Sequence, residues 1–434
     1  MGDAAVPDAF APEDGRLGLG DPDFPQHAFE RYAALRAACP VHRALLADST
    51  LGSVPAPLRD RPLWAVTGYD AAVAALVDER LSVDPHTGFT AEDLAAMPGG
   101  NEPETRVLLR TMLSVDPPEH TRLRKLVQPS FTARAIAAWA PRIQQIADRL
   151  LDAAEAGAAA RGEAAPRRGL ELVSAYAYPL PIAVIFELLG IPESDRSRVH
   201  GWTEDLFRSG LEPDGRMAAG MRAFAAYGRE LVAAKTAAPG EDLLTQLVHA
   251  AQDGDSLDQD ELVAMIFLLI LAGHVTTVNL IASAAYALLT HPDQRALLAD
   301  DPDLVDGAIE ETLRCWGPAE LASERYALED LELSGIDVRR GDLVLPILAA
   351  ADRDPARFAD PDRFDLARPD ARRHLAFGKG VHACLGAPLA RLEGRIAVGT
   401  LFRRCPDLRL AVPAEQIRQR AMPLRGIDAL PLTY

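Results

Sequence analysis

A glycine-rich stretch at residues 377–386 (FGKGVHACLG) has the most distinctive chemistry in the chain. It brings one cysteine, Cys384, to the predicted start of a helix, where backbone N–H groups and the helix dipole favour a thiolate. Gly378 and Gly386 would let a large flat cofactor approach the backbone, and Phe377 can shield the sulfur from water. The segment therefore predicts a sulfur ligand for a metal cofactor; the alternative is a buried free cysteine.

Two pairs of polar residues have helical spacing. Glu311 and Arg314 lie three positions apart, so they share a helix face and can form an ion pair. His120 and Arg124 lie four positions apart and can bind one anion together. The alternative for the second pair is a basic, solvent-exposed helix face.

A long apolar stretch is interrupted by Ala272, Gly273 and Thr276. Gly273 has no side chain and would leave room beside a cofactor. The Thr276 hydroxyl can bond to the carbonyl of Ala272 and open the helix locally, which makes a small pocket where oxygen could bind. The alternative is a tolerated polar patch in a core helix.

The element that carries this stretch is predicted as one helix over residues 257–290. Ser256 with Gln259 forms one candidate capping box at its start, and Asp258 with Glu261 forms another. The first half of the helix is apolar on every face, so we expect it to pass through the middle of the protein. The other predicted helices are 172–189, 217–235, 304–316 and one from Cys384 to about 403; the predicted strands are 63–67, 331–333 and 343–345.

The composition is that of a soluble globular protein. The chain has 434 residues, 48% of them hydrophobic, and a net charge of −18, which argues against a general nucleic-acid binder. The longest apolar run, Leu262 to Gly273, is shorter than the roughly 20 residues that a membrane span needs. We find no secretory signal, and the four cysteines are too scattered for a disulfide framework. We therefore expect a cytoplasmic protein, monomeric and without a membrane or nucleic-acid partner.

The motif at residues 377–386 resembles the haem-binding signature Phe-x-x-Gly-x-x-x-Cys-x-Gly of the cytochromes P-450 at all four defined positions. The other motifs follow in the family's order, and the resemblance covers residues from about 24 to 434. It implies haem b (iron protoporphyrin IX) with Cys384 as the iron ligand. It also implies a mainly α fold with small β-sheets, a triangular prism with a long central helix over the haem. We expect a single catalytic domain over residues 24–434, after a flexible segment at residues 1–23.

The resemblance assigns roles to further residues. Glu311 and Arg314 would form a buried network with Arg363 and support the cysteine loop. Ala272, Gly273 and Thr276 would lie on the oxygen side of the haem. The residues implied to bind the haem, mainly through its propionates, are His120, Arg124, Arg325, His374 and His382, with Phe377, Gly378 and Gly386 beside the sulfur.

Two positions depart from the family pattern. The family usually has an acid directly before the threonine, where this chain has Val275, which we include among the catalytic positions. Acid and alcohol together normally deliver protons while oxygen is cleaved, so Val275 puts the usual proton relay in doubt. Asp352 stands where asparagine is commoner.

The function implied is that of a monooxygenase that hydroxylates or epoxidises a hydrophobic secondary metabolite, a polyketide or macrolide, a terpenoid or a peptide. It would use O2 and two electrons from a ferredoxin and its reductase. The basic residues expected to steer an acidic ferredoxin are Lys379, Arg391, Arg395, Arg122 and Lys125; the alternative is ordinary solubilising charge. Two other functions remain open, a peroxide-driven or non-hydroxylating enzyme with the same fold, and a haem-based binding or sensor protein.

The substrate pocket that the resemblance implies is built from separate, mostly apolar or small segments. They are residues 82–101, 202–211, the region of Val275, 318–322 and 421–426. Within them Glu320 is a candidate contact for a cationic or hydroxyl group; the alternative is a solvent-facing side chain.

Overall fold

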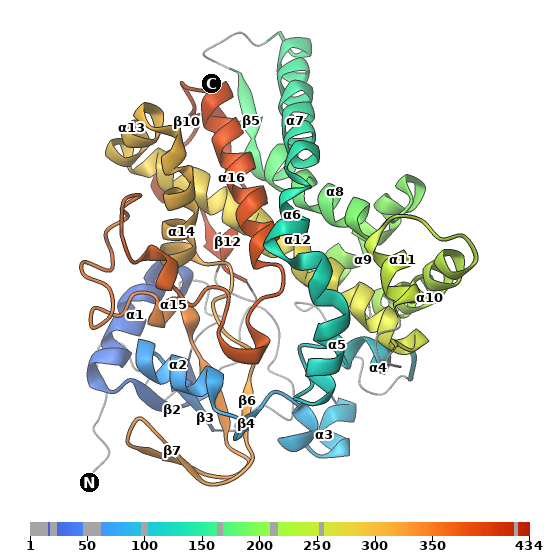
Figure 1. The fold of residues 1–434 in the computed structure, drawn as a ribbon. Helices are drawn as coiled ribbons and strands as arrows, with labels where there is room; N and C mark the ends of the chain where they lie inside the picture. The colour runs from blue at the N-terminus through green and yellow to red at the C-terminus, as the bar shows by residue number, and fades with distance from the viewer. Residues whose placement is uncertain are drawn as a thin grey trace.

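The computed structural model describes residues 16–17, 24–46, 62–96, 103–162, 168–208, 216–250, 256–420 and 424–434. This part of the chain is mainly helical and has four small β-sheets, of which the largest lies at the bottom of Figure 1. The predicted fold class is confirmed.

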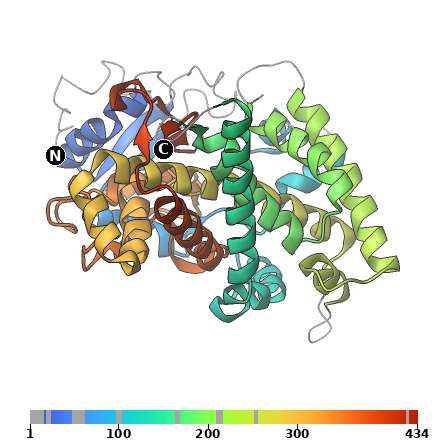
Figure 2. The same ribbon diagram turned by 90° about the horizontal axis from the view of Figure 1, so that it is seen from above.

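Helix α12 (Gln259–Thr290) is the central element. It runs from the region of α10 and α11 on one side of the molecule to α13 and α14 on the other (Figures 1 and 2). Of the two predicted starts, the second is right: Asp258 accepts from the backbone N–H of Glu261, and the Glu261 carboxylate accepts from that of Asp258. Among the described residues, α12 is the one helix apolar and long enough to span a membrane, and 67% of its apolar window is buried inside the protein. It is a core helix.

Helices from both halves of the chain pack on α12. Its contacts include α8 (Pro179–Leu188), α14 (Val305–Trp316) and α16 (Ala387–Arg404). The remaining α-helices are α1 (Phe24–Ala38), α2 (Tyr69–Val77), α3 (Ala91–Ala96), α4 (Pro103–Leu109), α5 (Glu119–Val127), α6 (Ala133–Ala137), α7 (Ala140–Ala160), α9 (Glu193–Arg208), α10 (Arg216–Ala237), α11 (Leu243–His249), α13 (Pro292–Asp300) and α15 (Leu348–Ala351). The predicted helix over 172–189 is in fact a π-helical turn, Val173–Ala177, followed by α8, because Pro179 restarts the helix.

The largest sheet has six strands in the order β1-β2-β3-β9-β6-β4. These are β1 (Arg16–Leu17), β2 (Val41–Leu46), β3 (Leu63–Val66), β4 (Leu81–Ser82), β6 (Arg325–Ala327) and β9 (Leu343–Pro346). β3 pairs with β9 in parallel, and β6 pairs with β9 antiparallel so that Arg325 lies opposite Val344. The pairing with β9 thereby fixes the position of the Arg325 backbone in the sheet. Strand β1, which precedes the predicted domain start at residue 24, pairs with β2 in parallel.

Three smaller sheets complete the fold. They are β10-β13-β5, β11-β12 and β7-β8, with β5 (Gly169–Glu171), β7 (Leu331–Leu333), β8 (Ile336–Val338), β10 (Arg409–Leu410), β11 (Gln419–Arg420), β12 (Gly426–Ile427) and β13 (Pro431–Thr433). The strands predicted near residues 63, 331 and 343 are confirmed. The largest apolar core lies among α7, α8, α10, α12 and α16, and a second core lies under the six-stranded sheet.

Candidate active site

The cysteine loop has a shape that only glycine allows at two positions. Gly378 and Gly380 have φ values of +66° and +77°, in the left-handed region, and a Cβ on Gly380 would lie 2.9 Å from the Leu76 carbonyl oxygen. The backbone N–H of Cys384 donates to the Phe377 carbonyl at 2.8 Å, which closes the loop. Gly386 is the N-cap of α16, so the sulfur lies beside the start of a helix.

Cys384 lines a cavity of about 290 Å³. Burial raises the pKa of its thiol, although the backbone N–H groups of Gly386 and Ala387 and the charges of Arg124 and Arg391 lower it. Cys384 is nevertheless exposed to the cavity. The same N–H groups and guanidinium charges would stabilise a thiolate that binds a metal ion.

Helix α12 forms another part of the cavity wall. Ala272, Gly273, Thr276 and Thr277 line the cavity, and the Thr276 hydroxyl donates to the Ala272 carbonyl at 2.9 Å, as predicted. Val275 does not line the cavity. The position that departs from the family pattern thus lies beside the cavity lining.

Gly273 serves helix packing as well as the cavity. A Cβ on this residue would lie 3.2 Å from Cδ1 of Ile185, on α8, which lines the same cavity. The glycine therefore lets α8 approach α12 closely.

Basic side chains gather at one edge of the cavity. His120, Arg325 and His382 line it, and the two imidazole rings lie 4.2 Å apart between centroids. Nδ1 of His120 and Nε2 of His382 are buried without a hydrogen-bond partner. Arg325 is only 3% exposed, and its hydrogen bond to the Ser323 carbonyl is long at 3.4 Å. Burial lowers the pKa of all three groups, that of His382 to about 4.

Asp116 is an acidic residue beside this group, but its Oδ1 lies 4.0 Å from Nε2 of His382, beyond hydrogen-bond distance. The buried ring nitrogens and the guanidinium therefore still require an accepting partner. A flat cofactor whose carboxylates reach this edge while its metal reaches Cys384 would supply both missing partners. The residues present thus fit a haem.

Arg124, which is predicted to bind a haem propionate, also binds the cysteine loop. It lines the cavity, and its Nη1 donates to the carbonyls of Val381 and Ala383 at 2.9 and 2.8 Å. Arg124 therefore holds the cysteine loop against α5.

The prediction for His374 is wrong. Its Nε2 lies 3.1 Å from the Glu310 carboxylate, and its Nδ1 accepts from the backbone N–H of Ala376 at 3.1 Å. Both ring nitrogens are engaged, and the residue does not line the cavity. Glu310 also binds Arg391 at 2.6 Å, and this buried cluster lowers the pKa of Glu310 to about 2.

The prediction for Arg363 is also wrong. Glu311 and Arg314 are fully buried and paired at 2.8 Å, but the third member of the network is Arg368, whose Nε lies 2.8 Å from Glu311. The side chain of Arg363 is 64% exposed and reaches Asp365 instead. Only its backbone takes part, since its carbonyl accepts from Arg314 and Arg368.

Glu320 is not a substrate contact or a solvent-facing residue. It is completely buried and accepts from Nε and Nη2 of Arg425 at 2.6 and 2.8 Å and from the Tyr32 hydroxyl at 2.6 Å. Its carboxylate is thus engaged in joining α1 to the C-terminal segment.

Asp352 is buried and accepts from the backbone N–H of Leu375 at 2.6 Å. Burial raises its pKa well above the usual value for an aspartate. A neutral aspartic acid resembles asparagine in shape, which agrees with the residue that is commoner in the family at this position.

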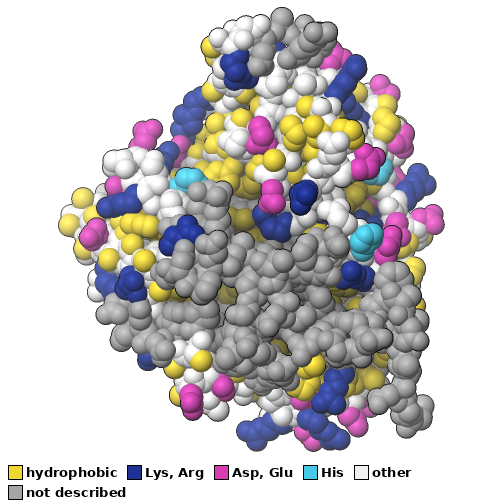
Figure 3. All heavy atoms as spheres, turned by 180° about the vertical axis from the view of Figure 1, so that it is seen from behind, with side chains coloured by type: hydrophobic (Ala, Val, Ile, Leu, Met, Phe, Trp, Pro, Cys, Tyr) yellow, Lys and Arg dark blue, Asp and Glu magenta, His cyan; other side chains and the backbone are white. Residues whose placement is uncertain are grey.

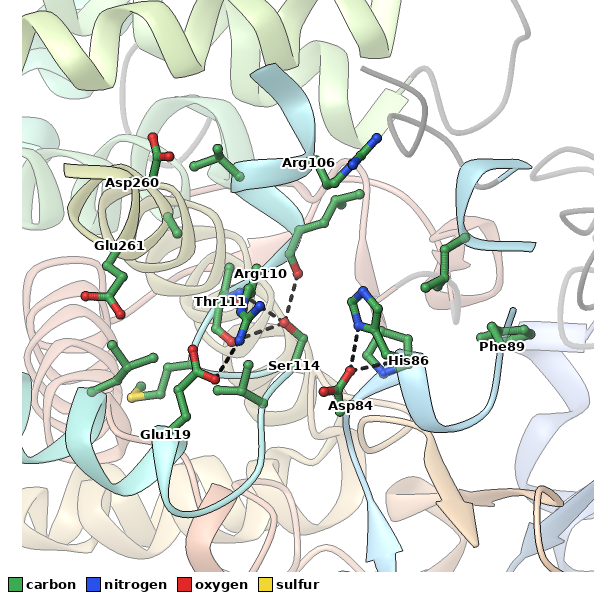
Figure 4. A pocket seen from close by; sticks show the side chains of 18 of the residues that line it. Asp84, His86, Phe89, Arg106, Arg110, Thr111, Ser114, Glu119, Asp260 and Glu261 are labelled. Carbon is green, nitrogen blue, oxygen red and sulfur yellow. Dashed lines mark hydrogen bonds and ion pairs between the residues drawn. The ribbon is translucent and has the colours of Figure 1, made fainter. Parts of the chain in front are cut away.

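A second cavity of about 1030 Å³ adjoins the first, and Met112 lines both. Figure 4 shows its charged groups: Arg110 faces Glu119 at 2.7 Å, Asp84 bonds to His86 at 2.8 Å, and the carboxylates of α12 lie at one side. Its apolar residues include Phe89, Leu94, Val107, Leu109, Val115, Leu123, Ala264 and Met265.

The predicted substrate segments reach the two cavities unequally. Residues 84–95 contribute to the larger cavity, and residues 318–322, apart from Glu320, contribute to the smaller one. Trp202 packs on Phe224 and Tyr227 instead. The predicted positions 97–101, 209–211 and 421–423 lie outside the described residues.

The five predicted basic residues do not form one free patch. Arg391 binds Glu310, Arg395 lies 3.8 Å from Asp306, and Arg122 pairs with Glu261 at the start of α12. Lys379 and Lys125 are exposed. Figure 3 shows the face of the molecule that points away from the viewer in Figure 1. On the described part of that face, basic and acidic side chains are interspersed.

The comparisons with known proteins agree with this geometry. A model of the family "Cytochrome P450" matches residues 229–408. The cytochrome P450 monooxygenase PikC of Streptomyces venezuelae is 45% identical over 96% of this chain and 94% of that protein. 6-Deoxyerythronolide B hydroxylase of Saccharopolyspora erythraea is 39% identical over 93% of this chain and 95% of its own. The crystal structure of myxobacterial cytochrome P450 CYP267B1 in complex with myristic acid superimposes with a TM-score of 0.84 at 41% identity, over 96% of this chain and 98% of that one. The chain belongs to the cytochrome P450 family of haem-dependent monooxygenases.

Proposed function

We propose that this protein hydroxylates or epoxidises a hydrophobic secondary metabolite, of the polyketide or macrolide, terpenoid or peptide classes. The observation that carries the proposal is that Cys384, on the loop before α16, and Thr276, on α12, line one largely apolar cavity. The named hydroxylase among the relatives and the fatty acid bound in a structural neighbour support a hydrophobic small-molecule substrate.

The protein's own residues have distinct tasks in this reaction. Cys384 would bind the iron of haem b, while His120, Arg124, Arg325 and His382 would bind its carboxylates. When bound, the haem activates O2 with two electrons, and a thiolate ligand increases electron donation to the iron. Gly273 and Ala272 leave the α12 wall without bulky side chains, and Thr276 places a hydroxyl oxygen at the cavity while it donates to the Ala272 carbonyl.

The volume of the larger cavity, about 1030 Å³, supports a large substrate. It shares Met112 with the smaller one, so a molecule with its body among Phe89, Leu94 and Val107 could reach the haem cavity with one end. Its volume lies at the upper end of the range for ligand pockets, about 300–1,000 Å³. We therefore propose substrates larger than a simple terpene or a short fatty acid.

We propose a ferredoxin with its reductase as the electron source, and a monomeric, cytoplasmic protein. The exposed Lys379 beside the cysteine loop supports contact with an acidic partner. Val275 favours one competing chemistry, a peroxide-driven reaction, because the usual acid is missing.

The test uses the haem-loaded protein and a panel of natural products. Those that shift the haem spin state are incubated with NADPH, ferredoxin, ferredoxin reductase and labelled dioxygen. Product with one labelled oxygen atom supports the proposal. Product only with hydrogen peroxide supports the peroxide-driven alternative, and binding without any oxidation supports a binding or sensor protein.

A further inference from the structure

Among the described residues that line the larger cavity, Glu324 is the one carboxylate without an N–H or cationic partner. Six carboxylates line this cavity: Asp84, Glu119, Asp258, Asp260, Glu261 and Glu324. Figure 4 shows Glu119 facing Arg110 and Asp84 bonded to His86. Arg122 binds Glu261, Arg229 lies 3.4 Å from Asp260, and Asp258 caps α12. These five carboxylates are therefore engaged by the protein itself.

The surroundings of Glu324 do not compensate its charge. The side chain is exposed to the cavity, and its one hydrogen bond comes from the Tyr326 hydroxyl at 3.4 Å, near the limit for such a bond. Burial raises the pKa of Glu324, and the Tyr326 hydroxyl is the one group that lowers it. Neither Arg325, its neighbour in sequence, nor Arg106, on the same cavity, offsets this shift.

Glu324 lies at the border between the two cavities. It directly precedes β6, where Arg325 lines the smaller cavity and Tyr326 lines the larger one. Successive side chains of an extended strand point to opposite sides, although their Cα atoms are only about 3.8 Å apart. A ligand group held by Glu324 is thus next to the strand that carries a residue of the haem cavity. Met112 lines both cavities and marks the passage between them.

The charge of the larger cavity favours a cationic ligand group at Glu324. A substrate that fills the cavity takes Glu324 out of water, and this costs free energy unless the substrate brings a donor. A charged donor forms a hydrogen bond roughly twice as strong as a neutral one. Six carboxylates line the cavity against two guanidinium groups, those of Arg106 and Arg110, and a cleft lined mostly by one sign of charge attracts the opposite sign.

We infer that Glu324 binds a cationic nitrogen of the substrate, a protonated amine on an otherwise hydrophobic molecule. The nitrogen lies in the larger cavity, and the end that is oxidised extends past Met112 into the smaller one. The inference rests on the proposed monooxygenase function and narrows its substrate class to metabolites with a basic nitrogen. Glu324 orients the substrate and takes no part in the oxygen chemistry.

Three dodecyl compounds that differ only in their head groups test this inference. N,N-Dimethyldodecylamine is a cation at pH 7, 1-dodecanol is neutral and laurate is an anion. Calorimetric titration of the haem-loaded protein gives the Kd of each. We expect the wild type to bind the amine at least about tenfold more tightly than the alcohol, because hydrogen bonds to charged groups are the stronger ones. Laurate should bind most weakly of the three.

Glu324→Gln keeps the shape of the side chain and removes its charge. The amine should then bind about ten- to a hundredfold more weakly, the loss expected for a hydrogen bond between charged groups, and the alcohol should bind as before. Asp260→Asn is the matched control, because it removes a carboxylate of the same cavity that is 61% exposed and paired with Arg229. Its amine affinity should stay within about twofold of the wild type.

Glu324→Lys reverses the charge and should make laurate bind more tightly than the amine. If Glu324→Gln does not fold, this variant and the three ligands on the wild type still decide the question. Equal affinity of the wild type for amine and alcohol would overturn the inference, and so would equal losses of amine affinity in Glu324→Gln and Asp260→Asn.

The Soret band reports where the amine lies. A red shift of this band on amine binding would show the nitrogen on the iron instead of at Glu324, and would also overturn the inference. Failure of the proposed function looks different. In that case the wild type binds the amine through Glu324 and yet forms no oxidised product with NADPH, ferredoxin and its reductase.

Discussion

The Nε of Arg368 lies 2.8 Å from Oε1 of Glu311, and the two side chains are 7% and 0% exposed. Arg314 binds both oxygens of the same carboxylate, so two guanidinium groups surround one buried charge. Arg368 also binds the carbonyls of Ala359 and Asp360, which ties α14 to the loop that precedes the cysteine segment.

Removing Arg368 should destabilise the protein strongly. Arg368→Ala leaves part of a buried carboxylate uncompensated, and we expect the free energy of unfolding to fall by about 3–5 kcal/mol. Arg363→Ala is the matched control, because that side chain is 64% exposed; its effect should stay within about 0.5 kcal/mol. Urea unfolding of the haem-loaded protein measures both, and equal losses would contradict the assignment of Arg368 to the network.

Asp352 should make stability depend on pH. Its pKa is raised in the folded protein by burial, so its contribution is fully present below the unfolded pKa of about 3.9 and is lost as the pH rises toward the folded pKa. Asp352→Asn keeps the acceptor for the Leu375 N–H and has no proton to lose. We expect the variant to gain stability over the wild type by up to ~1.4 kcal/mol per pH unit above about pH 4. Parallel stability–pH curves from urea unfolding would show that Asp352 is not neutral in the fold.

Arg325 should bind the haem through charge. Arg325→Leu removes a charge-assisted donor worth about 1.5–3 kcal/mol, so haem should dissociate about ten- to a hundredfold faster. The rate of haem transfer to apomyoglobin measures this change. Arg372→Leu, at an exposed position outside the cavity lining, is the control. Equal rates in the two variants would place Arg325 outside the haem site.

The sequence predicts the contacts between residues that are close together on one helix. The capping box of Asp258 and Glu261, the Thr276–Ala272 bond and the Glu311–Arg314 pair all join residues three or four positions apart. Their geometry follows from helical spacing alone.

The wrong predictions concern contacts between distant segments. Arg368 and Arg363 lie close together in sequence, and only the path of the irregular loop decides which one turns inward. Glu320 meets Arg425 across 105 positions, and His374 meets Glu310 across 64. Glu393 of α16 is buried although its sequence neighbours include Arg391 and Arg395. Only the packing of α16 against distant segments decides which of these charged residues is buried.

The reduced carbonyl complex of the haem-loaded protein tests the central claim, that the Cys384 sulfur binds the iron as a thiolate. The wild type should show the strongly red-shifted Soret band of thiolate ligation, and Cys384→Ser should lack it while it retains the helical circular dichroism of the wild type. A red-shifted band that survives in Cys384→Ser, or one that the wild type never shows, would contradict the claim.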